Sequence, residues 1–249
     1  HKNGKLDNHT VFDGSQQTVQ ELLQKSGYET AMIGKWHLDS QPTHFDHWEI
    51  LPGQGSYYNP DFIVSDGRKK YEGYVTNIIT DLGLNWLDKE RDKDKPFCLF
   101  LHHKAIHRNW MSDTTYLSLY EDKVFEVPSN FFDNYEGRIA VTDQGFYMGE
   151  HGWFDKRFMY EESFSTPLLM RLPSKFKRKG EIREMVQNID FAPTMLAIAG
   201  AEIPSDIQGV SLLPLLTDEK SPVEWRKSLY YHYYEYPAEE VQLCHYLSI

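Results

Sequence analysis

The fold is indicated most clearly by residues 75–110, VTNIITDLGLNWLDKERDKDKPFCLFLHHKAIHRNW. The apolar positions of its first part share one helical face that runs to about residue 91: Val75, Ile78, Ile79, Leu82 and Trp86. A charged turn at 92–96 ends this helix, and the apolar run 97–101 follows as a strand that we predict to be fully buried. A helix, a tight turn, a buried strand and a polar loop are typical of an α/β unit built on a mostly parallel sheet.

Other segments predict further elements of the same kind. We expect helices at 15–26, with a capping box formed by Thr18 and Glu21, and at 190–199, capped by Asp190. Strands are expected at 31–33, at 166–172 and at the tyrosine-rich 228–236. Residues 39–68 are rich in Pro, Gly, His and Tyr, and we predict irregular surface structure there. The predicted fold class is therefore α/β, with a mostly parallel sheet sandwiched by helices.

Composition and charge narrow the class of protein. The chain has 249 residues, 40% of them hydrophobic and 25% charged, which fits one globular domain of enzyme size. Its net charge of −11 argues against binding to nucleic acid or to anionic lipid. No apolar run approaches the roughly 20 residues that cross a bilayer, so no membrane span is predicted. Cys98 and Cys244 lie outside any CxxC pattern and are interpreted as structural.

Polar residues follow two of the predicted strands, where active sites of α/β folds lie. Lys35 and His37 come after the strand at 31–33, although a Lys and a His in a loop are often only solvated surface groups. His102, His103 and His107 follow the strand at 97–101. Three histidines could bind a transition metal, but their spacing lacks the Glu of HExxH, and a zinc site is disfavoured.

A carboxylate and a carboxamide stand side by side at Asp143 and Gln144. Their hard oxygens suit Ca²⁺ or Mg²⁺ better than a soft metal. An Asp-Gln-Gly turn would use the same residues with Gly145, so spacing alone leaves both interpretations open.

Several of these stretches occur together in one known family. They are GKWHL at 34–38, HKAIH at 103–107, TDQG at 142–145 with GEHG at 149–152, and DFAPT at 190–194. In this order they resemble the type I, formylglycine-dependent sulfatases of the alkaline phosphatase superfamily. Residues 143–167 look more particularly like bacterial sulfatases similar to N-acetylglucosamine-6-sulfatases. The resemblance implies an alkaline-phosphatase-like fold, with part of the sheet missing here, and hydrolysis of sulfate esters of glycosaminoglycan sugars, 6-O-sulfated N-acetylglucosamine in particular.

The resemblance also implies catalytic roles. In that family a hydrated formylglycine attacks sulfur while Ca²⁺ balances charge. Lys35, His37 and Lys156 would contact the sulfate oxygens or hold the nucleophile, and His107 would assist the leaving alkoxide or contact the sulfate. Fixed cations aimed at a transferring anionic group make physical sense, because they stabilise charge that develops in the transition state.

Metal, substrate and location follow from the same resemblance. Asp143 and Gln144 would bind Ca²⁺. Asp155 and Arg157 would hydrogen-bond sugar hydroxyls, with a surface ion pair as the alternative. The implied partner is a sulfated carbohydrate, and the implied location is the periplasm or the outside of the cell.

The chain departs from the family in lacking the C/S-x-P-x-R motif that supplies formylglycine. Ser40 and Ser165 each precede a proline by two residues, but His44 and Leu169 stand where the Arg should be. We therefore expect the nucleophile motif upstream of this chain, and we expect the chain alone to be inactive.

A second departure lies at Ala140-Val141, where similar proteins place further helices and most of a buried strand. We expect a discontinuity there, within a single incomplete sulfatase domain spanning 1–249. A C-terminal subdomain is expected to begin at about 225–249.

Two other classes compete with a sulfatase. One is a phosphoryl or phosphonate ester hydrolase of the same superfamily, which would more often show extra Asp and His ligands for two zinc ions. The other is a noncatalytic glycan-binding relative, which would lack the nucleophile in its gene.

Overall fold

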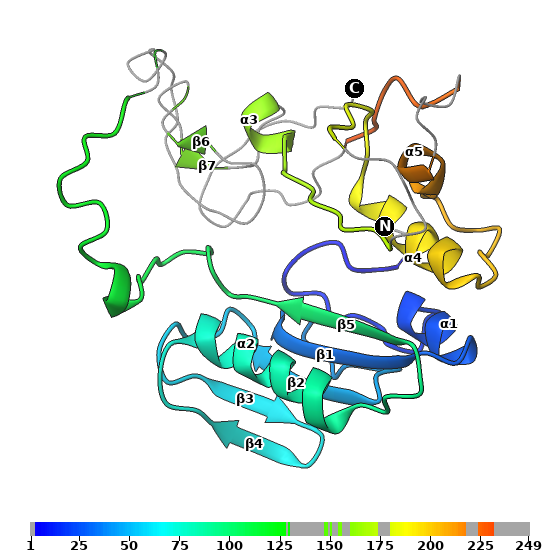
Figure 1. Cartoon of the computed structure of the whole chain (residues 1–249), viewed down its shortest axis with the longest axis horizontal. Coiled ribbons are helices and arrows are strands. Elements are labelled where there is room, and N and C mark those ends of the chain that lie inside the picture. Colours follow the sequence, from blue (N-terminus) through cyan, green and yellow to red (C-terminus); the bar gives the residue numbers. More distant parts are fainter. Residues whose placement is uncertain are drawn as a thin grey trace.

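The computed structural model describes residues 3–127, 129, 147–148, 150, 154–155, 160–173, 180–217 and 224–231, with the backbone alone at 154–155. Its main sheet contains β1 (Glu29–Trp36), β2 (His47–Pro52), β3 (Asp61–Val64), β4 (Gly67–Lys70) and β5 (Phe97–His102). They are arranged in the order β4-β3-β2-β1-β5 (Figure 1). β1 pairs in parallel with both β2 and β5, whereas β3 and β4 continue from β2 as an antiparallel meander. The sheet is therefore mixed, with its parallel part around β1.

The helices are α1 (Val19–Lys25), α2 (Val75–Asn85), α3 (Glu161–Phe164), α4 (Phe191–Ala199) and α5 (Leu213–Thr217). A π turn, η1 (Trp86–Glu90), extends α2, and 3-10 turns lie at η2 (Thr114–Tyr116) and η4 (Asn188–Asp190). Two short strands, β6 (Tyr147–Met148) and β7 (Phe154–Asp155), pair antiparallel. None of the described helices combines the length and apolarity needed to cross a membrane.

The main core forms where α2 lies across one face of the sheet (Figure 1). Its buried residues are Ala31, Ile33, Leu51, Tyr57, Phe62, Val75, Ile79 and Trp86. Met32, between Ala31 and Ile33, is also fully buried, and alternate residues of a strand point to opposite faces. On the other side of α1, which contacts β1, lies α4 (Figure 1). Both faces of β1 are thus covered, as expected for a sheet sandwiched by helices.

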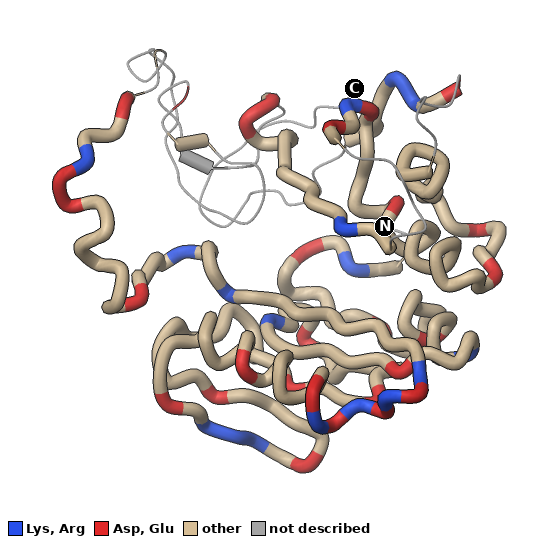
Figure 2. Tube along the Cα trace, viewed as in Figure 1, with Lys and Arg blue, Asp and Glu red and all other residues tan. Residues whose placement is uncertain are grey.

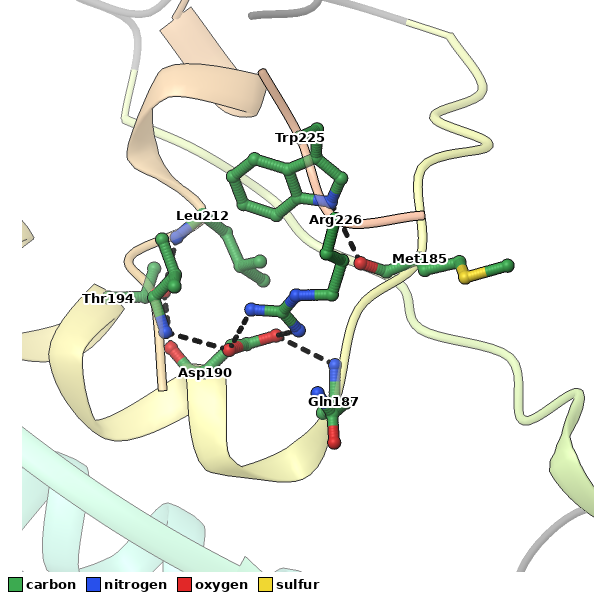
Figure 3. Close-up of polar contacts among 8 residues, drawn as sticks. Met185, Gln187, Asp190, Thr194, Leu212, Trp225 and Arg226 are labelled. Carbon is green, nitrogen blue, oxygen red and sulfur yellow. Dashed lines mark hydrogen bonds and ion pairs between the residues drawn. The ribbon is translucent and has the colours of Figure 1, made fainter. Parts of the chain in front are cut away.

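A second, smaller core lies in residues 172–225. Leu212, Leu215 and Leu216 are buried and pack with partly buried side chains that include Phe191 and Trp225. Beside it Arg226 donates two hydrogen bonds to the fully buried Asp190 carboxylate, at 2.5 and 2.7 Å (Figure 3).

That carboxylate also organises the backbone around it. It accepts from Gln187 N and from Val210 N, each at 2.8 Å. The neighbouring Thr194 hydroxyl donates to Asp190 O and accepts from Leu212 N at 2.8 Å (Figure 3). We call this set of contacts the Asp190 network; it ties together three segments that are distant in the chain.

The helix predictions at 15–26 and 75–91 are confirmed, with a shorter first helix. α1 begins at Val19 because Thr18 is its N-cap, and the Thr18 side chain accepts from Glu21 N at 3.4 Å. The helix at 190–199 is also confirmed, and Asp190 stands at its N-cap position, but its side chain makes no capping hydrogen bond to α4. Its side chain takes part instead in the Asp190 network, where it accepts from Arg226, from the Val210 amide and from the Gln187 amide of the preceding turn.

Several strand predictions are wrong. Residues 39–68 hold β2, β3 and the first half of β4, because Ile50, Leu51 and Phe62 are buried in the sheet despite the turn-forming residues around them. β5 is only partly buried, and Phe97 is 41% exposed, because β5 is the edge strand of the sheet within the described residues.

Two further predicted strands do not form where the structure describes them. Residues 166–172 have no strand partner there, and Leu169 is 94% exposed. Residues 228–231 are also not a strand, and 232–236 lie outside the described residues. A strand needs a pairing neighbour, so an apolar or aromatic run alone does not make one.

Candidate active site

The site is built at the carboxyl ends of the parallel strands. Lys35 is inside β1, which runs past the predicted end at residue 33, and His37 follows the strand directly. Gly34 is opposite His102, the last residue of β5. The loop that carries His107 therefore leaves the sheet at the same end as His37. Trp36 is opposite Pro52, so the chain after β2 also leaves there. Parallel pairing thus brings Lys35, His37 and the His107 loop to one end of the sheet.

Gly34 allows β1 and β5 to approach closely at this end of the sheet. Its φ is +109°, and a Cβ atom at this position would lie 2.0 Å from His102 O. Nδ1 of His102 donates to Lys35 O at 3.3 Å. The backbone that carries Lys35 is therefore fixed against the end of β5, and a larger residue at 34 would force the two apart.

A hollow of about 640 Å³ lies beside His107. It is lined by Gln54, Gly55, Ser56, Tyr57 and Tyr58 after β2, and by Lys104, His107, Arg108, Asn109 and Met111 after β5. This lining contains cationic, amide and aromatic side chains but no carboxylate among the described residues. In a chain of net charge −11 such a hollow suits an anionic ligand.

Charge is distributed unevenly between the two ends of β5. The loop that leaves its carboxyl end carries Lys and Arg, whereas the mixed charges of 88–95 lie at the other end of the strand (Figure 2). The loop at the end of the sheet where β1 places Lys35 and His37 therefore has cations without the interspersed acidic residues of 88–95.

His107 is held with a defined tautomer. Its side chain is 8% exposed, and its Nδ1 lies 2.7 Å from Arg108 O. A carbonyl oxygen only accepts, so Nδ1 carries the hydrogen and Nε2 is the nitrogen that can exchange a proton with a ligand. This geometry suits a general acid or base.

His102 and His103 have a different character. Burial lowers the pKa of both imidazoles, although the contact with Lys35 O partly opposes this at His102. His103 Nδ1 is buried without a hydrogen-bond partner among the described residues. Both rings are thus held neutral near pH 7, unlike a group that would bind an anion by its charge.

Cys98 fits its interpretation as a structural residue. It is a free thiol in β5, and burial raises its pKa to about 11. It is therefore protonated at neutral pH and a poor nucleophile.

The remaining predicted site residues are not placed. Asp143, Gln144, Lys156 and Arg157 lie outside the described residues, as do Cys244 and the predicted discontinuity at 140–141. Asp155 is described by its backbone alone, in β7 opposite Tyr147. Among the described residues, no group of three or more His, Cys, Asp or Glu side chains could hold a metal ion. The calcium site therefore stays a prediction.

Of the residues that line the hollow, sequence analysis singled out only His107 as a site residue, and those it missed include Gln54, Tyr57 and Lys104. Lys104 lies within HKAIH at 103–107, so the motif itself was a signal. Gln54 and Tyr57 fall in 39–68, which was predicted to be irregular, and nothing in their local pattern distinguishes them.

Two family models match the chain. One described as Sulfatase matches residues 5–147, and one described as N-sulphoglucosamine sulphohydrolase, C-terminal, matches residues 149–248.

Individual relatives carry similar names. An N-acetylglucosamine-6-O-sulfatase of Bacteroides thetaiotaomicron is 38% identical, over 99% of this chain and 65% of that protein. The human N-acetylglucosamine-6-sulfatase is 23% identical, over 79% of this chain and 46% of its own length. The chain thus spans about half to two thirds of these relatives. The alignment with the bacterial relative has 365 positions, whereas this chain has 249 residues. At least 116 of its positions are therefore gaps in this chain.

A solved structure extends the likeness to the fold. It is described as a complex with the protein's substrate, D-glucosamine-2-N,6-O-disulfate. Its sequence is 37% identical and its TM-score is 0.89, over 96% of this chain and 72% of that one.

Proposed function

The chain belongs to the sulfatase family, and from this premise we propose that it forms part of an enzyme that hydrolyses sulfate esters of sulfated sugars. The proposed substrate is 6-O-sulfated N-acetylglucosamine of glycosaminoglycans. The names of the relatives, and the disulfated glucosamine bound to one of them, support this substrate class.

One observation carries the proposal. Lys35, His37 and the loop that carries His107 lie at the carboxyl ends of two paired parallel strands, and His107 lines a hollow whose described lining has no carboxylate. A fixed cation and proton-exchanging imidazoles are what cleavage of an anionic ester with a poor leaving group requires.

The sugar is proposed to enter from the hollow. The hollow is lined by His107 but not by Lys35 or His37. If Lys35 and His37 hold the sulfate, His107 lies between the sulfate and the sugar. Tyr58 and the amide side chains of the lining suit a carbohydrate, and Arg108 suits an acidic one.

In the reaction the bond between sulfur and the sugar oxygen breaks as the nucleophile attacks sulfur. Lys35, His37 and Lys156 would stabilise the charge on the sulfate oxygens. Starting as the imidazolium, His107 would deliver the proton on Nε2 to the leaving alkoxide and become the neutral Nδ1–H tautomer that Arg108 O holds. A formylglycine hydrate, supplied from outside this chain, would be the attacking group.

Asp143 and Gln144 would contribute two of the ligands to Ca²⁺, which would balance the negative charge of the nucleophile and sulfate. Their oxygens fit a hard cation in kind. Two ligands are too few for tight binding, so we propose that other carboxylates complete the site.

Asp155 and Arg157 are proposed to select the sugar through its hydroxyl groups. The enzyme is proposed to act in the periplasm or outside the cell, where it would encounter sulfated glycosaminoglycans. The division of the chain into one incomplete domain, with a subdomain starting near 225, is proposed on the same family resemblance.

The test uses protein expressed from the complete gene. We expect sulfate release from 6-O-sulfated N-acetylglucosamine, and a His107→Gln variant that loses at least about 100-fold in kcat. Faster hydrolysis of phosphate monoesters would favour the phosphoryl hydrolase. Binding of the sulfated sugar without turnover would favour the noncatalytic relative.

A further inference from the structure

The loops after β2 and β5 are joined by two buried side chains, Tyr57 and Lys104. Each is 4% exposed. The Tyr57 hydroxyl donates to His107 O at 2.5 Å, and Lys104 Nζ donates to Gln54 O at 2.9 Å. The Lys104 ammonium also lies 4.6 Å from the centre of the Tyr57 ring. The two side chains therefore cross between the same two loops and contact each other.

These contacts fix both ends of the short segment that carries His107. His107 N donates to Lys104 O at 3.0 Å, which closes a turn, and Tyr57 holds the carbonyl at its far end. Burying an ammonium group has a large desolvation cost, so its hydrogen bond and aromatic contact make this arrangement rigid.

The same turn after β2 also reaches His37. Nε2 of Gln54 lies 3.4 Å from His37 Nδ1, and the backbone carbonyl of Gln54 is the one that Lys104 binds. Gln54 and Tyr57 thus contact the two histidines that come from the ends of β1 and β5.

We propose that Tyr57 and Lys104 are positioning residues that hold His107 at a fixed place relative to His37. This inference rests on the proposed function, in which His107 protonates the leaving sugar. Neither residue needs to touch the substrate; each acts through the backbone of the loop that bears His107.

The expected effect depends on the leaving group. A general acid displaced by about 1 Å can cost about 100-fold in rate. A sugar alkoxide needs this proton, whereas an activated aryl sulfate leaves without it. Loss of positioning should therefore lower kcat for the sugar sulfate and leave the aryl sulfate almost unaffected.

The experiment compares Tyr57→Phe and Lys104→Met with the wild type, in protein expressed from the complete gene. Tyr57→Phe removes the hydroxyl and keeps the ring on which Lys104 lies. We expect kcat for 6-O-sulfated N-acetylglucosamine to fall by about 10- to 100-fold with little change in KM. The kcat for 4-nitrophenyl sulfate should change by less than about threefold.

Tyr74→Phe is the matched control. The Tyr74 ring stacks on Tyr57, and its hydroxyl donates at 3.0 Å to Met111 O, four residues beyond His107. The Tyr74→Phe substitution removes the same kind of hydrogen bond, from a tyrosine hydroxyl to a backbone carbonyl, in the same region. We expect kcat for both substrates to stay within about twofold of the wild type. Thermal unfolding of all variants separates a loss of fold from a loss of positioning.

Each result has a defined meaning. Equal losses on both substrates, or no loss in Tyr57→Phe, would overturn the inference while leaving the proposed function intact. A wild-type enzyme that releases no sulfate from either substrate would instead contradict the proposed function. If Lys104→Met does not fold, Tyr57→Phe still decides, because it leaves the charge and the packing in place.

Discussion

The main sheet and the region at 180–231 are held together in different ways. In the sheet, β1 and α2 bury a continuous set of apolar side chains, and the polar residues of the hollow lie beyond the ends of the strands. In the 180–231 region the apolar core has three buried leucines, and beside it lies a buried ion pair whose carboxylate also accepts from two backbone amides. A small apolar core thus leaves the relative positions of its segments to be fixed by a few directional polar contacts. Removing one of these contacts has a large effect on stability, because few others replace it.

The strongest test of this difference removes the centre of the Asp190 network. Asp190→Ala leaves the Arg226 guanidinium, which is only 15% exposed, without its carboxylate, along with two backbone amides. Breaking one side of a buried ion pair costs about 3–5 kcal/mol, and we expect a loss of that size. Urea unfolding would measure it, and a change below about 1 kcal/mol would mean that the small apolar core alone supports the region.

Removing apolar atoms from the main core tests the sheet by the same measurement, the free energy of unfolding. Ile79 is fully buried against the sheet, so Ile79→Ala should cost about 2–4 kcal/mol through lost burial and the cavity left behind. If the two regions are held independently, the double variant with Asp190→Ala should be additive within about 0.5 kcal/mol. A larger deviation would show that the contact of α1 with α4 couples them.

Acid should distinguish the regions through Asp190. Burial alone would raise its pKa, but hydrogen bonds from Arg226 and from the amides of Val210 and Gln187 outweigh it and lower the pKa. Its contribution to stability is therefore present above the unfolded pKa of about 4 and is lost as pH falls through the folded value.

We expect Asp190→Asn to remove that part of the acid dependence. Urea midpoints of the wild type and the variant, followed from about pH 6 to pH 3, would converge as the wild-type carboxyl takes up its proton. Parallel curves would show that Asp190 does not lose its charge in this range.

The smallest effect is expected at an exposed pair in the same region. Arg183 and Glu181 approach to 3.1 Å with side chains 84% and 70% exposed. Glu181→Ala should change the free energy of unfolding by no more than about 0.5 kcal/mol, because solvent and salt screen the pair. An effect near that of Asp190→Ala would mean that burial is not what distinguishes the two ion pairs.

Local sequence patterns predicted a limited part of this structure. Helical spacing located α2, since an apolar face repeated every three to four residues must be buried to be stable. The motifs at strand ends identified Lys35, His37 and His107, and parallel pairing explains why they lie at the same end of the sheet. The same patterns failed for β2 to β4, whose short strands depend on their neighbours for burial and pairing.

What the sequence by itself determined is therefore the family and the residues of its motifs, because both are carried by stretches of five or so neighbouring positions. The tertiary structure alone decided that Tyr57 holds the carbonyl of His107, 50 positions away, and that Asp190 pairs with Arg226, 36 positions away. Such contacts depend on where the whole chain places two distant segments, and a buried polar group takes whichever partner the fold brings within hydrogen-bond distance.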